Sequence, residues 1–455
     1  MRRLVLTLAV LSLVAAPLVA QGPGADSTMQ ATFTRWVAEH RLVGVVAGRL
    51  LPKGSRVIAA GTRRAEAADA ITDSTLFEIG SITKAFTGTL LAEMVLRREV
   101  ALDDPVARYL PGWTVPTFKG QPITLLDLAT QSSGLPSLPD DFRPADGLDP
   151  YADYTEARLA AFLARYQLQR APGTRYEYSN LGMALLGRAL AERAHKPYEL
   201  LLRERILTPL GMADTRIDLT ADDLRRAAGG HNDQLLPTSD WHLPAFVAAG
   251  ALHSTVPDLL RLAAAVRDTT RGPLAKAIAL AIRPQRAYRG ADSIGLAWHH
   301  LHVDGNDVVW HNGGTGGFRS FLVVSIATGR AVVVLANASV PMDPIALSIL
   351  REQPPLGPPV REVMKEVALP AAALARFVGR YEFVENFAIE ISQDSTGLLA
   401  QATNQMRLRL YPSATATFFF RAVKAELQFE VAATGAVTGV TLRQNANTSV
   451  GRKVR

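Results

Sequence analysis

Strand-like segments lie at both ends of residues 42–340, and helix-like segments lie between them. Residues 42–61 contain two apolar runs joined by a Pro/Gly turn, which is typical of a β-hairpin. From residue 292 onward, β-branched and aromatic runs are divided by DGN and ATGR turns. Residues 100–285 show helical spacing with frequent turns. The pattern predicts an α+β fold, in which one antiparallel sheet of about five strands is flanked by helices and a helical lobe is inserted between the sheet-forming ends.

A proline-rich stretch marks the best candidate domain boundary. Four of the six residues 354–359 are proline, which predicts a stiff spacer. Beyond it, alternation such as Leu427, Phe429 and Val431 on one face predicts short strands of a small all-β, barrel-like domain. A chain of 455 residues is also too long for one ordinary core. The predicted parts are a larger domain at 21–353, a linker at 354–368 and the small domain at 369–455.

The first twenty residues have the pattern of an export signal. Two arginines precede a 17-residue apolar run, Leu4 to Ala20, which is interrupted by Pro17. This length and these flanks predict a secretory signal peptide, cleaved after Ala20, rather than a retained membrane anchor. We therefore expect a periplasmic or secreted protein with no stable membrane span after cleavage.

Composition excludes several classes of function. The formal net charge is +7, but the arginines are scattered and form no basic stripe, so we expect no nucleic-acid partner. The chain has no cysteine, which excludes thiol catalysis, disulfides and thiolate metal sites. His300 and His302 could face one way on a strand, but no carboxylate accompanies them at a suitable spacing. We expect neither a metal site nor a cofactor.

Ser81 and Lys84 form the first candidate catalytic pair. They lie in the apolar segment TLFEIGSITKAFTG, directly after Gly80. Positions i and i+3 share one face of a helix, and Ile82, Ala85, Phe86, Thr89 and Leu90 continue the helical spacing. A buried ammonium has a lowered pKa and can accept a proton from serine. The alternative is that Ser81 caps a core helix and Lys84 reaches solvent.

Tyr178 and Asn180 form a second candidate element, in a turn before a predicted helix. A tyrosine near a lysine is held closer to its phenolate form and can act as a base. An asparagine can orient a substrate amide through its donor and its acceptor. The alternative is an aromatic turn in which Asn180 is the helix N-cap.

The third element is the segment WHNGGTGGFRS, in which His311 precedes Gly313 and Gly314 between two predicted strands. Glycines at a strand edge let backbone N–H groups face a substrate without obstruction. An N–H there, together with that of Ser81, could hold a developing oxyanion. The alternative is an ordinary glycine-rich hairpin.

Together these motifs resemble those of a known enzyme family. SITK (Ser81–Lys84), YSN (Tyr178–Asn180) and HNG (His311–Gly313) have the order and approximate spacing of the three motifs of penicillin-recognising serine hydrolases. FEIGSITK is similar to the nucleophile segment of class C β-lactamases, whose fold DD-peptidases and some esterases share. The resemblance covers about residues 30–350, and FVGRYEF at 377–383 is similar to a β-domain often appended to such hydrolases.

The resemblance implies catalytic roles for three residues. Ser81 would attack a lactam or peptide carbonyl and form an acyl-enzyme. Lys84 and Tyr178 would remove the proton of Ser81 and later activate water. The implied activity is hydrolysis of β-lactam amide bonds by an exported class C β-lactamase-like enzyme.

The resemblance also implies substrate-binding residues. Asn180 would hold the substrate amide, the N–H groups of Ser81 and Gly314 would form an oxyanion hole, and Gly313 belongs to the same strand edge. His311 would help to bind the substrate carboxylate. Many class C β-lactamases have lysine there, and histidine is mostly neutral near pH 7.

Three functional hypotheses therefore remain open for this site. The first is β-lactam hydrolysis. The second uses the same residues as a DD-peptidase, D-amino-acid peptidase or short-chain esterase. The third is a sensor that is acylated and never deacylated, although all the implied catalytic residues are present. In each case we expect a small-molecule substrate, with the loops at 130–150 and 229–255 shaping its specificity.

Overall fold

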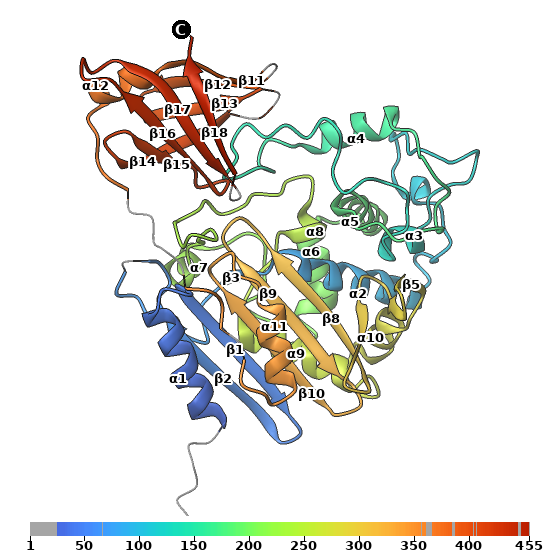
Figure 1. Cartoon of the computed structure of the whole chain (residues 1–455). Coiled ribbons are helices and arrows are strands. Elements are labelled where there is room, and N and C mark those ends of the chain that lie inside the picture. The colour runs from blue at the N-terminus through green and yellow to red at the C-terminus, as the bar shows by residue number, and fades with distance from the viewer. Residues whose placement is uncertain are drawn as a thin grey trace, which may run out of the picture.

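The computed structural model (Figure 1) describes residues 25–65, 67–355, 357–360, 366–384, 387–403, 405, 407–444 and 447–454. The predicted signal peptide at 1–20 lies outside these residues, as does part of the predicted linker, and the domain boundaries stay predictions. Across the described ranges, no helix combines the length and the apolar character needed to cross a membrane.

The central sheet is antiparallel and joins the two ends of the larger domain. Its strand order is β2-β1-β10-β9-β8-β7-β6-β5. The N-terminal hairpin pairs with the last strand of the domain, with Val45 opposite Ala336. The strands are β1 (Gly44–Leu51), β2 (Gly54–Gly61), β5 (Arg286–Arg289), β6 (Asp292–Ile294), β7 (His299–Val303), β8 (Asn306–Gly314), β9 (Arg319–Ser325) and β10 (Arg330–Ala336).

The expectation of about five strands was wrong, because the sheet has eight. The run from Ile294 to Val303 is divided by a loop, so that β6 and β7 are separate short strands. The edge strand β5, with the sequence RAYR, has no apolar alternation that would mark it as a strand.

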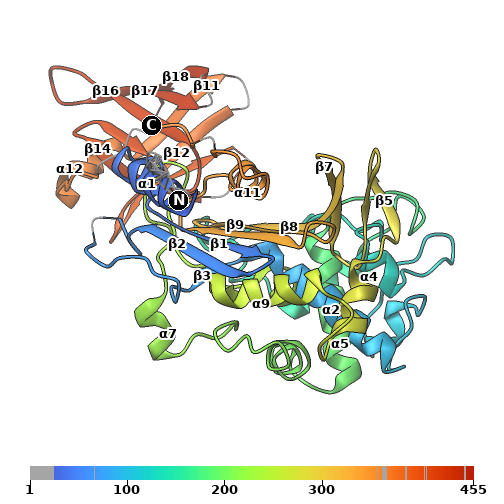
Figure 2. The same ribbon diagram turned by 90° about the horizontal axis from the view of Figure 1, so that it is seen from below.

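Helices cover both faces of this sheet (Figure 2). One face carries α1 (Ala25–Ala38) and α11 (Asp343–Leu350), which enclose a small core with Phe33 and Trp36. The other face carries α2 (Thr83–Leu96), α9 (Val256–Arg267) and α10 (Ala275–Ile282). The second face leads into the larger core, which continues into the helical lobe.

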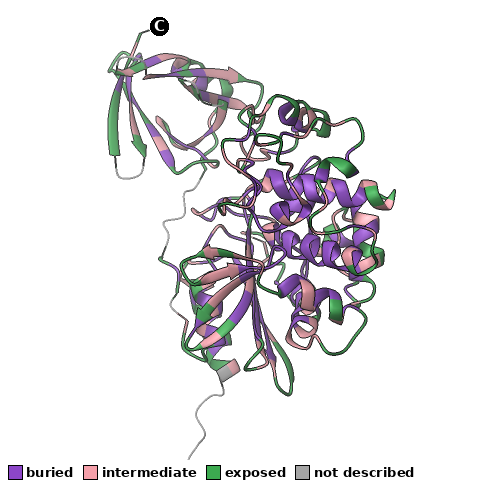
Figure 3. Ribbon diagram, turned by 90° about the vertical axis from the view of Figure 1, so that its right-hand side faces the viewer, coloured by how far each residue is buried: buried purple, intermediate pink, exposed green. Residues whose placement is uncertain are grey.

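The helical lobe lies between α2 and α9 in the sequence, and its helices are largely buried on their inner sides (Figure 3). Its longest helix, α5, is apolar from Leu181 to Ala191 on most of its surface. The remaining elements are η2 (Val106–Tyr109), α3 (Leu125–Ala129), α4 (Glu156–Arg165), α5 (Asn180–Ala194), α6 (Tyr198–Leu202), the π-helical turn η3 (Arg203–Leu207), α7 (Ala221–Arg226), α8 (Val247–Gly250), and the short strands β3 (Phe77–Glu78) and β4 (His253–Ser254).

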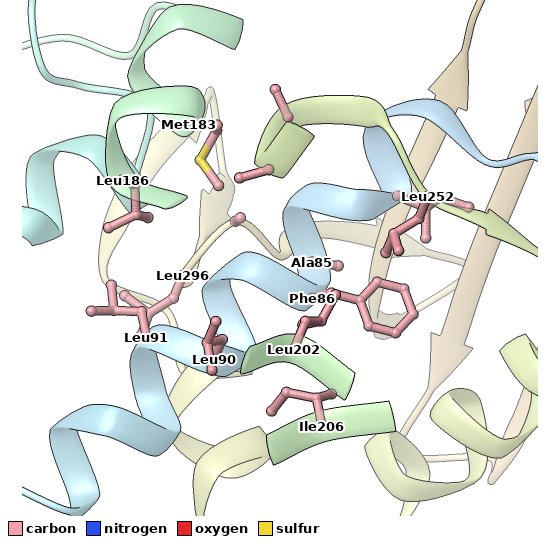
Figure 4. Close-up of a cluster of buried hydrophobic side chains, with 14 of the residues drawn as sticks. Ala85, Phe86, Leu90, Leu91, Met183, Leu186, Leu202, Ile206, Leu252 and Leu296 are labelled. Atoms are coloured by element: carbon pink, nitrogen blue, oxygen red, sulfur yellow. The ribbon is translucent and has the colours of Figure 1, made fainter. Parts of the chain in front are cut away.

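Helix α2 is surrounded by the core, as its apolar sequence predicts. Every residue from Thr83 to Met94 is buried. Figure 4 shows Phe86 and Leu90 of this helix beside Leu202 and Ile206 of the lobe. The helix is therefore held rigidly, which positions the residues of its first turn.

The C-terminal part is a closed barrel of eight strands, β11 to β18. Phe377, Tyr381, Phe418 and Phe429 fill its interior in mutual ring contact. This barrel and the layered α+β domain confirm the predicted fold class. Its elements are α12 (Ala371–Leu374), η4 (Ala375–Phe377), β11 (Gly379–Val384), β12 (Phe387–Asp394), β13 (Gly397–Ala402), β14 (Arg407–Ala414), β15 (Thr417–Phe419), β16 (Ala425–Val431), β17 (Val437–Gln444) and β18 (Asn447–Lys453).

We predict that Gly88→Ala destabilises the larger domain, because a Cβ at Gly88 would lie 1.9 Å from the backbone oxygen of Leu296. Overpacking of this kind costs about 1–3 kcal/mol. Urea unfolding measures the loss. Gly182→Ala in α5 is the matched control, since its Cβ would meet only side-chain atoms, at 3.3 Å or more. Equal unfolding free energies for the two variants would contradict the packing described for α2.

Candidate active site

The chain reaches Ser81 through a turn that is tied to the sheet. The backbone N–H of Ile79 donates to Leu252 O at 2.9 Å, and the hydroxyl of Ser320 donates to Ile79 O at 2.8 Å. Gly80 then adopts a φ of +49°, which glycine accepts without strain. Ser81 follows in a 3₁₀ turn, η1 (Gly80–Ile82), one residue before α2 begins.

Glycines allow this turn to lie directly on strand β8. A Cβ at Gly80 would stand 2.7 Å from the backbone nitrogen of Gly314, and one at Gly313 would stand 1.9 Å from Ile79 O. Both positions therefore require glycine. The contact brings Ser81 beside Gly314, whereas Gly313 packs behind the turn.

The functional groups of Lys84 and Tyr178 both lie within hydrogen-bonding distance of Ser81 Oγ. Lys84 Nζ donates to Ser81 Oγ at 2.8 Å and to Ala249 O at 2.6 Å. The Tyr178 hydroxyl donates to Ser81 Oγ at 2.6 Å. The ammonium nitrogen of Lys84 lies 4.8 Å from the centroid of the Tyr178 ring. The hydroxyl of Ser81 thus has two partners that can exchange protons with it.

Burial favours the neutral forms of both partners. Lys84 is 0% exposed, and desolvation holds its pKa well below the usual value of 10.5. Desolvation raises the pKa of Tyr178 above its usual value, and the hydrogen bond with Ser81 offsets only part of that rise. The structure therefore gives no support to a phenolate at Tyr178. The neutral amine of Lys84 is the better proton acceptor.

The Ser81 pocket is a cavity of about 40 Å³. Asn180 and Gly314 line it together with Ser81. Asn180 is the first residue of α5 but not its cap: Ser179 is the N-cap, and its Oγ accepts from Gly182 N at 2.8 Å. Asn180 instead lines the pocket with Tyr151, and its side chain offsets part of the rise that burial gives the pKa of Tyr151.

Sequence reasoning missed the aromatic wall of this pocket, formed by Tyr151, Trp241 and Phe246. The rings of Tyr151 and Trp241 are 5.2 Å apart, and so are those of Tyr151 and Phe246. The available signal was aromatic residues at the expected specificity loops, because Trp241 and Phe246 lie within 229–255 and Tyr151 directly follows 130–150. Their contribution to the pocket depends on how those loops fold together.

The structure does not support carboxylate binding by His311. Its ring is 1% exposed and does not line the Ser81 pocket. Its Nδ1 lies 2.6 Å from Asn312 O, and its ring packs 5.1 Å from that of His299. Burial, with His299 and Lys84 nearby, holds the pKa of His311 well below 6.5, so the ring stays neutral. A neutral, enclosed imidazole is a poor partner for a carboxylate.

Glu78 lies behind the pocket and also escaped sequence reasoning, although a carboxyl group in an apolar run was a usable signal. It is 5% exposed, and its Oε1 accepts from the Trp241 backbone N–H at 2.8 Å. Desolvation raises the pKa of Glu78 to about 8. Glu78 therefore connects the strand before Ser81 to the aromatic wall.

Comparison with known proteins gives two family matches. Residues 29–354 match the family model described as Beta-lactamase, and residues 364–453 match the one described as Domain of unknown function (DUF3471). Two solved structures show the same fold: a class C beta lactamase from Rhodobacter sphaeroides (24% identical, TM-score 0.60, 72% of this chain and 97% of that one) and a beta-lactamase/D-alanine carboxypeptidase from Yersinia pestis (23% identical, TM-score 0.60, 72% and 99%).

Two curated relatives are similar in sequence. D-alanyl-D-alanine-carboxypeptidase/endopeptidase AmpH of Escherichia coli (strain K12) is 31% identical over 272 residues, which cover 54% of this chain and 66% of that protein, just under two thirds. A beta-lactamase of Pseudomonas fluorescens is 26% identical over 316 residues, covering 62% of this chain and 84% of the relative.

We predict that Glu78→Gln raises stability above neutral pH. Below about pH 4.5 the carboxyl group is protonated in both states; between 4.5 and 8 the unfolded chain releases the proton and the folded chain keeps it. Wild-type stability therefore falls as pH rises through this window, by an amount on the order of a few kcal/mol. The variant lacks that fall.

Unfolding free energies of wild type and Glu78→Gln at pH 5 and pH 9 check this. Glu156→Gln is the control, because Glu156 is exposed on α4 and pairs only with Arg188 among the described residues. If the unfolding free energy of wild type rose relative to that of Glu78→Gln between pH 5 and pH 9, this result would contradict the assigned burial of Glu78.

Proposed function

Because the chain belongs to the beta-lactamase family and is a serine hydrolase of β-lactamase or DD-peptidase type, we propose that it is an exported enzyme of the class C type. In this proposal the enzyme opens β-lactam amide bonds through an acyl-enzyme on Ser81. The observation that carries this proposal is the convergence of Lys84 Nζ and the Tyr178 hydroxyl on Ser81 Oγ, at 2.8 and 2.6 Å. It supports a nucleophile with an adjacent base.

In the acylation step, Ser81 Oγ attacks the lactam carbonyl carbon. The neutral amine of Lys84 accepts the hydroxyl proton, and the backbone N–H groups of Ser81 and Gly314 bind the oxyanion. Collapse of the tetrahedral intermediate breaks the C–N bond. Tyr178 donates its proton to the leaving nitrogen and regains one from Lys84.

In the deacylation step, water attacks the ester carbonyl of the acyl-enzyme. The neutral amine of Lys84 accepts the proton of that water, as it accepted the serine proton before. The ester bond breaks, and the proton returns to Ser81 Oγ. The product carboxylic acid leaves, and the site is restored.

A second candidate function is cleavage of D-alanyl peptides by the same residues. It is supported by the 31% identity to AmpH, which is named as a D-alanyl-D-alanine-carboxypeptidase/endopeptidase. The neutral, enclosed His311 also favours it over a lactamase that needs a cation at this position. The same acyl-enzyme chemistry would then act on a peptide bond.

The proposal includes export and the division of the chain. The basic start and apolar run of residues 1–20 support a cleaved signal, with a periplasmic or secreted mature protein. The separate family matches at 29–354 and 364–453 support the proposed division into a hydrolase at 21–353, a linker at 354–368 and a β-domain at 369–455.

A substrate panel tests the function. We expect wild type to hydrolyse a chromogenic cephalosporin and to carry a mass adduct on Ser81, with turnover falling by about 10³-fold or more in Ser81→Ala. The control is Ser74→Ala, since Ser74 is exposed and outside the Ser81 pocket. The panel includes a D-Ala-D-Ala peptide and a short p-nitrophenyl ester.

Faster turnover of the peptide or the ester would replace the first candidate with the second. A stable adduct without turnover would identify a sensor. No adduct and no turnover with any of the three substrates would overturn a hydrolase on Ser81.

The assignment of Lys84 as proton acceptor predicts a pH profile. Its lowered pKa lets the amine be neutral at working pH, and protonation at lower pH removes the base, so kcat/KM should fall as pH decreases. Tyr178→Phe should lower the rate by about 10²-fold or more and keep this acidic limb. Glu78→Gln should also keep it, which separates Lys84 from the carboxyl group whose pKa is about 8. Loss of the limb in Tyr178→Phe would make Tyr178 the base instead.

A further inference from the structure

A second cavity adjoins the Ser81 pocket on the side of the C-terminal barrel. It measures about 490 Å³ and shares Trp241 and Thr315 with the Ser81 pocket. We call it the barrel-side cavity. Ligand pockets usually measure about 300–1,000 Å³, so the 40 Å³ beside Ser81 hold only the reacting bond of a substrate. The rest of a substrate has this larger space beside it.

The barrel supplies one wall of this cavity. Residues 421–424, in the turn between β15 and β16, line it opposite the loop after β8. The turn is anchored to the larger domain, because Asn232 Nδ2 donates to Arg421 O at 2.9 Å. The Arg421 guanidinium lies 4.0 Å from the centroid of the Tyr411 ring and pairs with Glu366 at 2.7 Å. The wall is therefore held in place.

The charged side chains that line the barrel-side cavity are mainly basic. Arg319, Arg421 and Lys424 face one acidic residue, Asp233. Lys424 is exposed at the tip of the turn and has no ion pair or hydrogen bond with any residue that the structure describes. The cavity therefore has a net positive lining with one uncompensated ammonium.

Arg319 links this lining to the reacting centre. Its Nη1 donates to Thr315 O and Phe318 O, each at 2.7 Å. It would stand 3.0 Å from a Cβ placed at Gly314, so the guanidinium lies against the proposed oxyanion hole. His311 is enclosed and does not line the cavity. Among the cationic residues that do line it, Arg319 is the one that lies against Gly314.

We propose that the barrel-side cavity is a substrate subsite that binds a carboxylate carried several atoms away from the reacting carbonyl, with Arg319 at its inner end and Lys424 of the barrel at its outer end. This inference rests on the proposed function of Ser81. It makes the barrel a determinant of specificity, and it places Arg319 and Lys424 in the role that sequence reasoning gave to His311.

Two matched pairs of probes test the proposal on the full chain. The first pair is the p-nitrophenyl esters of adipic acid, which carries a distal carboxylate, and of hexanoic acid, which does not. We expect wild type to prefer the adipate ester in kcat/KM. Lys424→Glu and Arg319→Gln should each lower that preference by about tenfold, since a charged hydrogen bond contributes at least about 1.5 kcal/mol. For Lys424→Glu the change should lie in KM.

The matched control is Lys276→Glu, which reverses a charge on an exposed residue of α10 outside both cavities. It should leave the preference unchanged. A loss that also appears in Lys276→Glu would reflect net charge rather than a subsite. No preference in wild type, or a preference that neither Lys424→Glu nor Arg319→Gln changes, would overturn the proposal.

The second pair separates this proposal from the function of Ser81. The monoanilide of adipic acid and hexananilide are titrated calorimetrically into Ser81→Ala. We expect tighter binding of the monoanilide, weakened about tenfold by adding Lys424→Glu. If wild type hydrolyses neither these esters nor the three substrates of the panel, the proposed function fails, while this titration still decides the subsite. Equal affinity for the two anilides would overturn it.

Discussion

The catalytic region is organised around one buried amine. Lys84 is 0% exposed, and an ammonium in that position would lose most of its hydration. Its Nζ instead has two acceptors, Ser81 Oγ and Ala249 O, and its pKa is lowered. Its burial requires that the lobe helices α5, α6 and α8, together with α10, enclose α2. The apolar packing around α2 therefore also sets the basicity of the amine, and the proposed role of Ser81 as nucleophile depends on it.

The second constraint is the close approach of two glycine-containing segments. The turn at Gly80 lies on β8 at Gly314, with no space for a Cβ on Gly80 or on Gly313. Strand β8 reaches this place because the last strands of the domain return to pair with the N-terminal hairpin. The sheet thus brings a backbone N–H from residue 314 beside a nucleophile more than two hundred residues earlier. The candidate active site therefore combines a local turn, which carries Ser81, with a strand that long-range pairing brings beside it and that carries Gly314.

The C-terminal barrel contributes residues to the cavity beside the Ser81 pocket. Its turn at 421–424 is anchored through Asn232 and forms a wall of the cavity that adjoins the Ser81 pocket. Trp241 belongs to both spaces, and its backbone is held by Glu78 directly before the nucleophile turn. In the proposed function, selection of substrate size and charge depends on the barrel, whereas acyl transfer depends on the larger domain. The two properties can change independently.

Local patterns in the sequence determined the layered α+β fold, the all-β tail and the pairing of Ser81 with Lys84, because helical and strand periodicities act over a few residues. The family resemblance added Tyr178, which no local pattern joins to Ser81. Only the tertiary structure decided that His311 is enclosed and neutral, and that Glu78 is buried against Trp241. Burial and pKa depend on every segment packed around a group, and these segments are distant in the chain. For the same reason, the sequence could indicate a barrel but not the cavity wall that it forms beside the site.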